Sequence, residues 1–208
     1  MSPKVTQQHK AQRRQQILDA AVRVFSQQGF EQTTMQDVIT DAGLSRGGVY
    51  SYFPGKDELF QAMLDQLDQQ NAEGLQALTI ASPDAWSGIE GLLAELTTSL
   101  GSASDALVAA VYEYFLTRGR TRWDYLRVRH SRIFDALLEL IRSGIEKREL
   151  DPVLPAETIT EALMAFSDGL MIHAVFQPPS QPHAEQQIAA LRLFLEAGLR
   201  PHARAVGS

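Results

Sequence analysis

The stretch GFEQTTMQDVITDAGLSRGGVYSYFPGKDELF, residues 29–60, decides the fold of this chain. It contains two short segments suited to helices, one on each side of a tight corner at Ala42-Gly43-Leu44. Gly43 can adopt the left-handed backbone conformation that such a corner requires. The segments therefore have the proportions of a helix-turn-helix, a motif whose second helix enters the major groove of DNA.

Each of these two short helices has a residue suited to cap its amino-terminal end. Thr33 or Thr34 can cap the first helix, and Gln36 stands three residues after Thr33, at the spacing of a capping box. Ser45 can cap the second helix, which extends to about residue 52 before Phe53-Pro54-Gly55 interrupts the chain. The apolar side chains predicted to hold the pair at a fixed angle are Val38, Val49 and Phe53.

The polar residues of the same stretch are left on the outside of the predicted motif. Their hydroxyl, guanidinium and ammonium groups are of the kinds that contact phosphates and base edges in DNA. The outward set comprises Thr33, Thr34, Ser45, Arg46, Tyr50, Tyr52 and Lys56. This stretch is therefore a candidate surface for double-stranded DNA.

The order of residues in this stretch resembles the DNA-binding domain of the tetracycline-repressor (TetR) family. The resemblance rests on G-F-x-x-T-T, then V-x-x-x-A-G-L-S-x-G-x-V-Y-x-Y-F, and finally G-K-x-x-L-F. With the preceding helix it covers residues up to 60. It implies a bundle of about nine helices, in which the first three bind DNA and the last two form the four-helix interface of a homodimer.

The resemblance also implies a role for individual residues of the motif. The residues implied to contact phosphates are Thr34, Ser45, Gly47, Tyr50, Tyr52 and Lys56, and those implied to lie against base edges are Gln36, Arg46 and Gly48. Two positions depart from the pattern of the family. Ile39 stands where alanine is usual, which predicts a changed distance or angle between the two helices, and Gly48 replaces a residue that often carries a hydroxyl.

The rest of the chain also shows helical periodicity, and no segment shows the sustained alternation of a strand, so the sequence predicts an all-α fold. Prolines and glycines mark the boundaries of the predicted helices. The predicted helices cover about residues 12–28, 33–43, 45–52, 56–75, 83–100, 104–119, 121–148, 155–176 and 184–199. The predicted domains are a flexible basic arm (1–10), a DNA-binding domain (11–71) and a ligand-binding and dimerisation domain (72–208).

Charge is unevenly distributed along the chain, whose net charge is -6. Residues 1–60 contain seven Lys or Arg and six Asp or Glu, so the acidic surplus belongs to the remainder. Lys4, Lys10, Arg13 and Arg14 precede any acidic residue. A basic amino-terminal arm is one way to reach DNA phosphates, and a solvated tail without such a role is the alternative.

The sequence gives little support to an enzyme. Its five histidines show neither H-x-x-x-H nor H-E-x-x-H spacing, and it has no P-loop, nucleophile elbow or Rossmann glycine pattern, so we expect no catalytic residues, metal or cofactor. The absence of cysteine fits a reducing cytoplasm, and no apolar run approaches a membrane span. An all-α adaptor that binds protein without DNA is a third class, but it leaves the outward polar residues unexplained.

The second predicted domain contains aromatic and apolar residues that could line a pocket for a small-molecule effector. The candidates are Trp86, Leu93, Tyr112, Phe115, Trp123, Phe134 and Phe166. Ordinary core packing is the alternative for each of them. We expect an apolar or amphipathic effector, and the acidic surplus of this domain also allows a cation held by aromatic faces.

Two further patterns concern the surface of this domain. The basic run from Arg118 to Arg132 is interpreted as solvated residues that pair with nearby acids or a partner subunit, and a second anion site is the alternative. The last two helices each carry an apolar stripe predicted to form the dimer interface, with an intramolecular core as the rival explanation. The predicted interface comprises Ile159, Leu163, Phe166, Gly169, Leu170, Ile188, Leu191, Leu195 and Leu199.

Together these expectations describe a repressor that an effector releases from a palindromic operator. The resemblance implies that effector binding moves the long helix that begins near Lys56 and so changes the separation of the two recognition helices.

Overall fold

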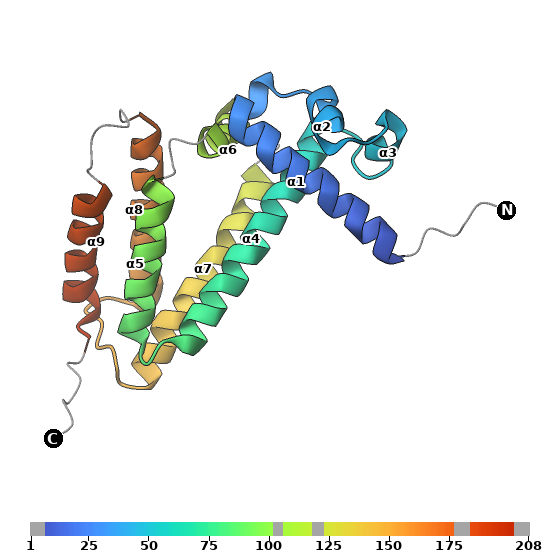
Figure 1. The fold of residues 1–208 in the computed structure, drawn as a ribbon. Coiled ribbons are helices and arrows are strands. Elements are labelled where there is room, and N and C mark those ends of the chain that lie inside the picture. Colours follow the sequence, from blue (N-terminus) through green and yellow to red (C-terminus); the bar gives the residue numbers. More distant parts are fainter. Residues whose placement is uncertain (1–6, 102–105, 118–122, 177–183, 202–208) are drawn as a thin grey trace. The chain divides into compact units, whose positions relative to one another are not determined.

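The computed structural model describes residues 7–101, 106–117, 123–176 and 184–201, and these ranges contain nine α-helices (Figure 1). The only strand-like pairing in the same ranges is an isolated bridge between Leu150 and Pro201. The prediction of an all-α chain is confirmed. The helices are α1 (Gln7–Gln32), α2 (Met35–Ala42), α3 (Arg46–Tyr50), α4 (Lys56–Ala81), α5 (Ala85–Gly101), α6 (Ala106–Thr117), α7 (Trp123–Glu146), α8 (Ala156–Phe176) and α9 (Ala184–Leu199).

The chain divides into two compact units, and the division is not contiguous in sequence. The first unit comprises residues 1–68 and 105–119, and the second comprises residues 69–104 and 120–208. The predicted boundary after residue 71 lies close to the first division. The sequence did not indicate that α6 belongs with α1 to α3, because its residues follow the predicted boundary by more than thirty positions.

The first helix differs from its prediction at both ends. It begins at Gln7, so residues 7–10 of the predicted flexible arm are helical, while residues 1–6 lie outside the described part. Its helical geometry is interrupted at Gly29, where φ is 77° and ψ is 179°. Gly29 was expected to end the helix, and a single further turn follows it. The interruption requires glycine because other residues are strained at this φ.

The core of the first unit contains a cluster of four buried aromatic rings among aliphatic side chains. Phe25, Phe30, Phe60 and Tyr114 come from α1, α4 and α6, and none of these side chains is accessible to solvent. Neighbouring ring centroids lie 4.7 to 5.9 Å apart, mostly in edge-to-face arrangements. Such packing fixes α6 on α1 and α4, the helices that precede and follow the helix-turn-helix.

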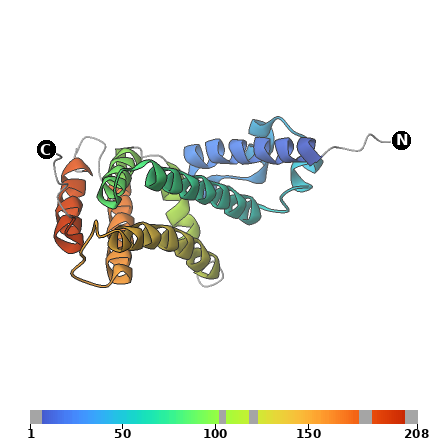
Figure 2. The ribbon, with the colours of Figure 1, turned by 90° about the horizontal axis from the view of Figure 1, so that it is seen from below.

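The core of the second unit is almost entirely aliphatic. Helix α9 packs on α5 and α8, and α7 packs on α5 and α8 (Figures 1 and 2). Asp84 caps α5, since its carboxylate accepts a hydrogen bond of 2.7 Å from the Ser87 amide; the predicted cap at Ser82-Pro83 was therefore two residues early. The bounds predicted for the last two helices agree with α8 and α9 within one residue.

Candidate nucleic-acid interface

Thr34 fixes the start of the first helix of the motif. Its side chain accepts a hydrogen bond from the Asp37 amide at 3.3 Å, and the Asp37 carboxylate accepts from the Thr34 amide at 2.8 Å and from its hydroxyl at 2.7 Å. These reciprocal bonds form a capping box. They also lower the pKa of Asp37, with the hydroxyl of Thr34 as the largest cause. The predicted partner Gln36 was wrong, because it stands one residue too early and bonds Thr40 instead.

Thr33 lies on the inside of the motif, which corrects its predicted outward position. Only 1% of the residue is exposed, and its hydroxyl donates a hydrogen bond of 2.7 Å to the carbonyl of Gly29. The hydroxyl thus satisfies a carbonyl released where α1 is interrupted. Thr33 is therefore a structural residue at the entry to α2, with no surface to offer to DNA.

The corner between α2 and α3 has the predicted conformation. Gly43 has φ 64° and ψ 30°, and its amide bonds back to the last turn of α2. The predicted small core is confirmed, since Val38 and Val49 are inaccessible and Phe53 is 4% exposed. Ile39, the departure from the expected alanine, is also buried and so adds volume between these helices and the rest of the unit.

Helix α3 is short and carries two glycines that play different structural roles. Ser45 caps it as predicted, because its hydroxyl accepts a hydrogen bond of 3.1 Å from the amide of Gly48. A Cβ at Gly48 would lie 3.1 Å from that hydroxyl oxygen, whereas a Cβ at Gly47 would meet nothing within 4 Å. Gly48 therefore protects the cap, and Gly47 leaves open backbone at the surface.

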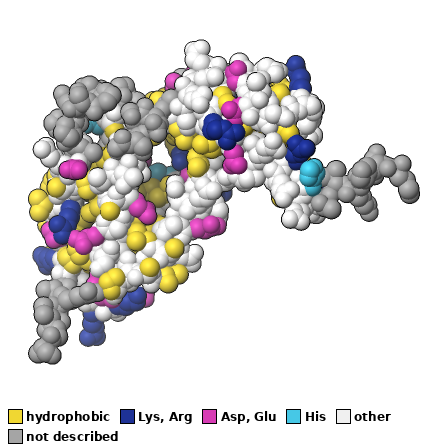
Figure 3. All heavy atoms as spheres, viewed as in Figure 1, with side chains coloured by type: hydrophobic (Ala, Val, Ile, Leu, Met, Phe, Trp, Pro, Cys, Tyr) yellow, Lys and Arg dark blue, Asp and Glu magenta, His cyan; other side chains and the backbone are white. Residues whose placement is uncertain are grey.

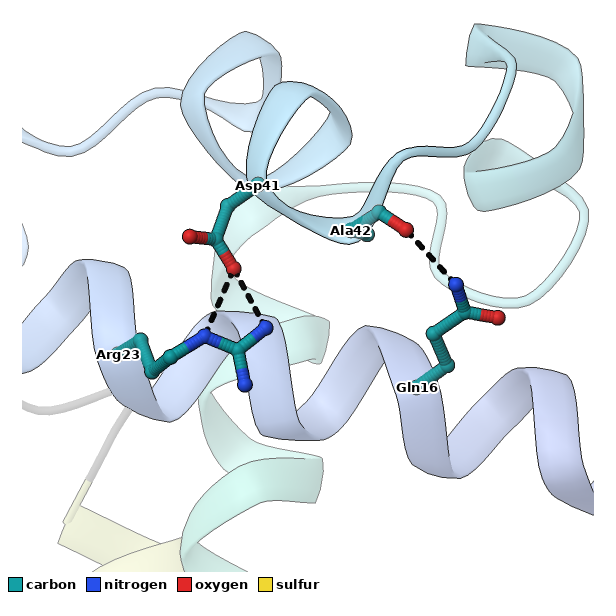
Figure 4. A network of polar contacts seen from close by, with 4 residues as sticks. All are labelled: Gln16, Arg23, Asp41 and Ala42. Carbon is teal, nitrogen blue, oxygen red and sulfur yellow. Dashed lines mark hydrogen bonds and ion pairs between the residues drawn. The ribbon is translucent and has the colours of Figure 1, made fainter.

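Two polar contacts attach the end of α2 to α1 (Figure 4). Arg23 donates two hydrogen bonds to one carboxylate oxygen of Asp41, at 3.0 and 2.6 Å. Gln16 donates to the carbonyl of Ala42 at 2.8 Å, which satisfies one of the free carbonyls at the helix end. Together they help to set the angle at which α1 supports the motif.

Most of the predicted DNA-contacting side chains lie at the surface of the unit. Thr34, Gln36, Ser45 and Arg46 are exposed, Tyr50 is 37% exposed, and Tyr52 is half-buried. The guanidinium of Arg46 lies 5.4 Å from the ring centroid of Tyr50, so the cation stacks on the aromatic face. This contact restricts Arg46 before any DNA is bound.

Lys56 makes contacts within its own unit. Its ammonium donates to the carbonyl of Phe30 at 2.7 Å and to that of Glu31 at 3.2 Å, and it lies 4.3 Å from the centroid of the Phe30 ring. The side chain therefore stabilises the last turn of α1. Its predicted phosphate contact stays a prediction.

Glu113 is a residue that the sequence did not single out. Its Oε2 accepts hydrogen bonds from the amides of Phe30 at 2.9 Å and Glu31 at 3.1 Å, and a Cβ on Gly29 would lie 3.1 Å from that oxygen. The carboxylate on α6 thus caps the turn that leads into the motif. Eighty-two or more residues separate these partners, so no local spacing could have revealed them.

Tyr114, the neighbour of Glu113, also joins α6 to this unit. Its hydroxyl accepts a hydrogen bond of 2.6 Å from the Gln61 side chain on α4. The predicted helix at residues 104–119, which corresponds to α6, had been placed in the predicted ligand-binding domain (72–208). In the structure it belongs to the first unit.

The predicted effector-pocket residues do not form one cluster in the second unit. Leu93 lines two cavities there, while Trp86, Phe134 and Phe166 are partly buried against its core. Tyr112 and Phe115 belong to the first unit, where Phe115 packs against Tyr114. Trp123 is 56% exposed. The candidates therefore do not all lie in one unit, because α6 belongs to the first unit, and the effector pocket itself stays a prediction.

Most of the predicted dimer stripe is intramolecular core. The residues that pack inside the second unit are Ile159, Leu163, Leu170, Ile188, Leu191, Leu195 and Leu199, each less than 9% exposed. These seven positions therefore belong to an intramolecular core, which was the alternative to the predicted dimer interface. The outer faces of α8 and α9 are formed by other residues. Apolar residues on those outer faces include Ile172 at 39%, Leu193 at 65% and Phe194 at 64% exposed.

Two other predictions of the sequence concern charge and metal. Arg127 pairs with Asp124 at 2.9 Å, as an exposed pair one turn apart, while residues 118–122 of the basic run lie outside the described residues. Within residues that the structure describes, no three His, Asp or Glu side chains are grouped in a way that could hold a metal. In the same part of the chain, no helix has the length and apolar content of a membrane span.

The closed core and exposed polar edge of α2 and α3 define a helix-turn-helix of the DNA-binding type. Comparison with known proteins gives two family matches. Residues 17–63 match "Bacterial regulatory proteins, tetR family", and residues 88–183 match "Tetracyclin repressor-like, C-terminal domain".

Whole-chain relatives agree with these matches. The uncharacterized HTH-type transcriptional regulator YfiR of Bacillus subtilis (strain 168) is 35% identical over 205 residues, which cover 96% of this chain and 98% of that protein. The chain therefore belongs to the TetR family, and it is a DNA-binding transcriptional regulator and not an enzyme.

Solved structures show the same fold at lower identity. A TetR transcription regulator from Haloarcula marismortui has a TM-score of 0.76 and 22% identity, with 91% of this chain and 99% of that chain covered. Thermus thermophilus FadR, described as a transcriptional repressor in complex with lauroyl-CoA, has a TM-score of 0.65 and 24% identity, with 94% and 100% covered.

Proposed function

We propose that this regulator is a cytoplasmic repressor that binds a palindromic operator as a homodimer and leaves it when a small apolar or amphipathic effector binds. The observation that carries the DNA-binding part is the contrast between the two faces of α2 and α3. Val38 and Val49 are fully buried, while Thr34, Ser45 and Arg46 are exposed on the other face. A surface of this kind offers hydrogen-bond donors on a rigid support.

The proposed contacts divide into base-reading and phosphate-binding groups. Arg46 is the proposed base reader, because a guanidinium can bind both acceptors of guanine in the major groove, and its stacking on Tyr50 limits the entropy lost on binding. Gln36, about two turns before the corner, is exposed and can read adenine. The proposed phosphate ligands are Thr34, Ser45, Gly47, Tyr50, Tyr52 and Lys56.

The outer face of α8 and α9 supports a homodimer. Phe194 is 64% exposed, and its ring lies 6.1 Å from that of Phe166; Ile172 on α8 and Leu193 on α9 are also exposed. A Cβ at Gly169 would meet nothing within 4 Å, so this part of α8 allows close approach of another helix. Two copies of this helix pair make a four-helix bundle. Figure 3 shows hydrophobic side chains at the surface of this unit.

The second half of the proposal, release by an effector, rests on cavities in the second unit and on the neighbours. FadR of Thermus thermophilus is a repressor solved with lauroyl-CoA, an amphipathic molecule. The second unit here contains an apolar cavity and an open groove with charged walls, on either side of Leu93. The cavity is suited to an apolar group, and the groove is suited to a polar or charged group of an amphipathic molecule.

Selection of duplexes from a random library by the purified protein tests the DNA-binding part. We expect an inverted repeat whose half-sites are about one helical turn, 34–36 Å, apart. Arg46→Ala should lose about 1–3 kcal/mol, or roughly 5- to 150-fold in Kd, on the selected site and far less on random DNA. Lys56→Ala and Tyr50→Ala should weaken both, because phosphate contacts are independent of sequence.

Arg127→Ala is the matched control, since Arg127 is also an exposed arginine on a helix but lies on α7. It should leave both affinities unchanged. The base-reading role of Arg46 is refuted if Arg46→Ala loses equal affinity on selected and random duplexes. Failure to enrich any sequence would contradict the proposed function as a whole.

A further inference from the structure

The last turn of α1, which leads into α2, is bonded to charged side chains of two other helices. Glu113 on α6 accepts hydrogen bonds from the amides of Phe30 at 2.9 Å and Glu31 at 3.1 Å. On the carbonyl side of the same two residues, the ammonium of Lys56 on α4 donates at 2.7 and 3.2 Å. Hydrogen bonds to charged groups are stronger than those between neutral groups. The Phe30–Glu31 turn is therefore fixed from both α4 and α6.

Gly29 makes room for the carboxylate of Glu113. A Cβ at position 29 would lie 3.1 and 3.2 Å from its two oxygens, which is tighter than an ordinary contact. The interruption at Gly29 resembles the start of a new helix, whose first amides need partners from outside that helix. Glu113 is this partner for Phe30 and Glu31. Gly29 thus serves the contact with α6 as well as the backbone conformation.

The place of Glu113 is fixed by its neighbour Tyr114. The ring of Tyr114 is fully buried and packs against Phe30 and Phe60. Its hydroxyl also accepts a hydrogen bond of 2.6 Å from Gln61 on α4. The half-buried carboxylate of Glu113 is therefore carried by a rigid part of the core, as a group that positions other residues requires.

The two helices of the motif depend on such attachments because they are short. Helices α2 and α3 have eight and five residues, whereas isolated helices shorter than about 12–15 residues are marginal in water. Arg23 and Gln16 attach the carboxyl end of α2 to α1. Its amino end at Met35 lies only a few residues after the Phe30–Glu31 turn. A shift of this turn therefore shifts α2 and, with it, α3.

We propose that Glu113 is a positioning residue for operator recognition, which fixes the Phe30–Glu31 turn and so places α2 and α3 against the bases without contacting DNA itself. This inference rests on the proposed function, since it needs an operator and Arg46 as the base reader. A carboxylate has no hydrogen to donate to a phosphate and repels its charge. Loss of the charge alone would thus leave DNA affinity unchanged or raise it, whereas loss of the positioning contact lowers affinity for the operator.

The first experiment measures Kd for the selected operator and for random duplexes, with full-length protein shown to be folded by circular dichroism. Glu113→Ala should bind the operator about tenfold more weakly and random duplexes within about twofold of wild type, because phosphate contacts do not depend on base register. Glu113→Gln keeps one acceptor oxygen and should lose less. Glu95→Ala removes an exposed carboxylate from α5 and should change neither affinity.

A double variant distinguishes positioning from a general loss of stability. In the Arg46→Ala background, Glu113→Ala should weaken operator binding by less than about threefold, because the base reader that it misplaces is already absent. A further loss of the full tenfold in that background would show that Glu113 acts independently of Arg46 and overturns the proposal. Equal losses on the operator and on random duplexes also overturn it.

Amide hydrogen exchange of the free protein gives a measurement that needs no DNA. In Glu113→Gln, the amides of Phe30, Glu31 and α2 should exchange at least about threefold faster, and those of the second unit at wild-type rates. Unchanged exchange in α2 overturns the proposal whatever the result with DNA. If wild type selects no duplex while exchange in α2 is faster, the proposed function fails and with it the role of Glu113 in recognition, but the attachment of α2 by Glu113 stands.

Discussion

The two units of this regulator are packed in different ways. In the first, four fully buried aromatic rings from three helices pack against one another in the core, and Thr34 and Ser45 cap the two helices of the helix-turn-helix. In the second, aliphatic side chains leave a cavity of about 140 Å³ and apolar residues at the surface. A surface that must match DNA needs fixed geometry, whereas the effector and the partner subunit proposed for the second unit would need space and exposed apolar surface.

The largest expected effect tests the closed aromatic core. Tyr114→Ala should lower the free energy of unfolding by about 3–5 kcal/mol, because it removes a ring that contacts Phe30 and Phe60 and leaves a cavity. Urea denaturation monitored by circular dichroism measures the loss. Leu92→Ala is the comparison in the second unit. Leu92 lines an existing cavity and is only partly buried, so its truncation should lower the free energy of unfolding by less.

Tyr114→Phe separates the ring from its hydroxyl. This variant keeps the aromatic packing and loses only the hydrogen bond from Gln61, so it should cost about 1 kcal/mol. If Tyr114→Ala were no more damaging than Leu92→Ala, the contrast in packing between the two units would be wrong.

A smaller effect is expected at the carboxylate that joins α6 to the entry of the helix-turn-helix. Glu113→Ala removes a charged acceptor from the amides of Phe30 and Glu31 and should cost about 1.5–3 kcal/mol in urea denaturation. Glu113→Gln keeps one acceptor oxygen and should lose less. Glu95→Ala changes an exposed glutamate on α5 and should shift stability by no more than about 0.5 kcal/mol. An equal loss for Glu95→Ala and Glu113→Ala would show that the capping contact contributes nothing of its own.

The sequence predicted the local features of the first unit well because they depend on residues close together in the chain. Gly43 at the corner, Ser45 as a cap and Val49 in the small core all follow from spacing within one or two turns. Thr33 was misplaced because both threonines suit a cap by composition. Only the backbone interruption at Gly29 decides that Thr33 turns inward and Thr34 caps α2.

Long-range packing accounts for the features that the sequence could not show. Glu113 and Tyr114 lie on an amphipathic helix whose pattern does not identify which unit it covers. The stripes of α8 and α9 were read correctly as apolar faces, but periodicity cannot distinguish a face buried in the same protomer from one buried against a partner. Leu195 lies in the core and its neighbour Phe194 is 64% exposed, which only the fold reveals.

The smallest expected effect concerns pH and the capping box of α2. The hydroxyl and amide of Thr34 lower the pKa of Asp37, so its carboxylate stabilises the folded state above the unfolded pKa of about 3.9. That contribution disappears as pH falls through the lower folded pKa. Asp37→Asn should cost about 0.3–1 kcal/mol at pH 7, and its difference from wild type should vanish near pH 2. Asp135→Asn, at an exposed position on α7, is the control for replacing a surface carboxylate in the same urea denaturation at pH 7. If the difference in the free energy of unfolding between Asp37→Asn and wild type persisted unchanged at pH 2, the side chain would act through packing and not through its charge. The polar contacts that fix the first unit would then be those of the remaining caps.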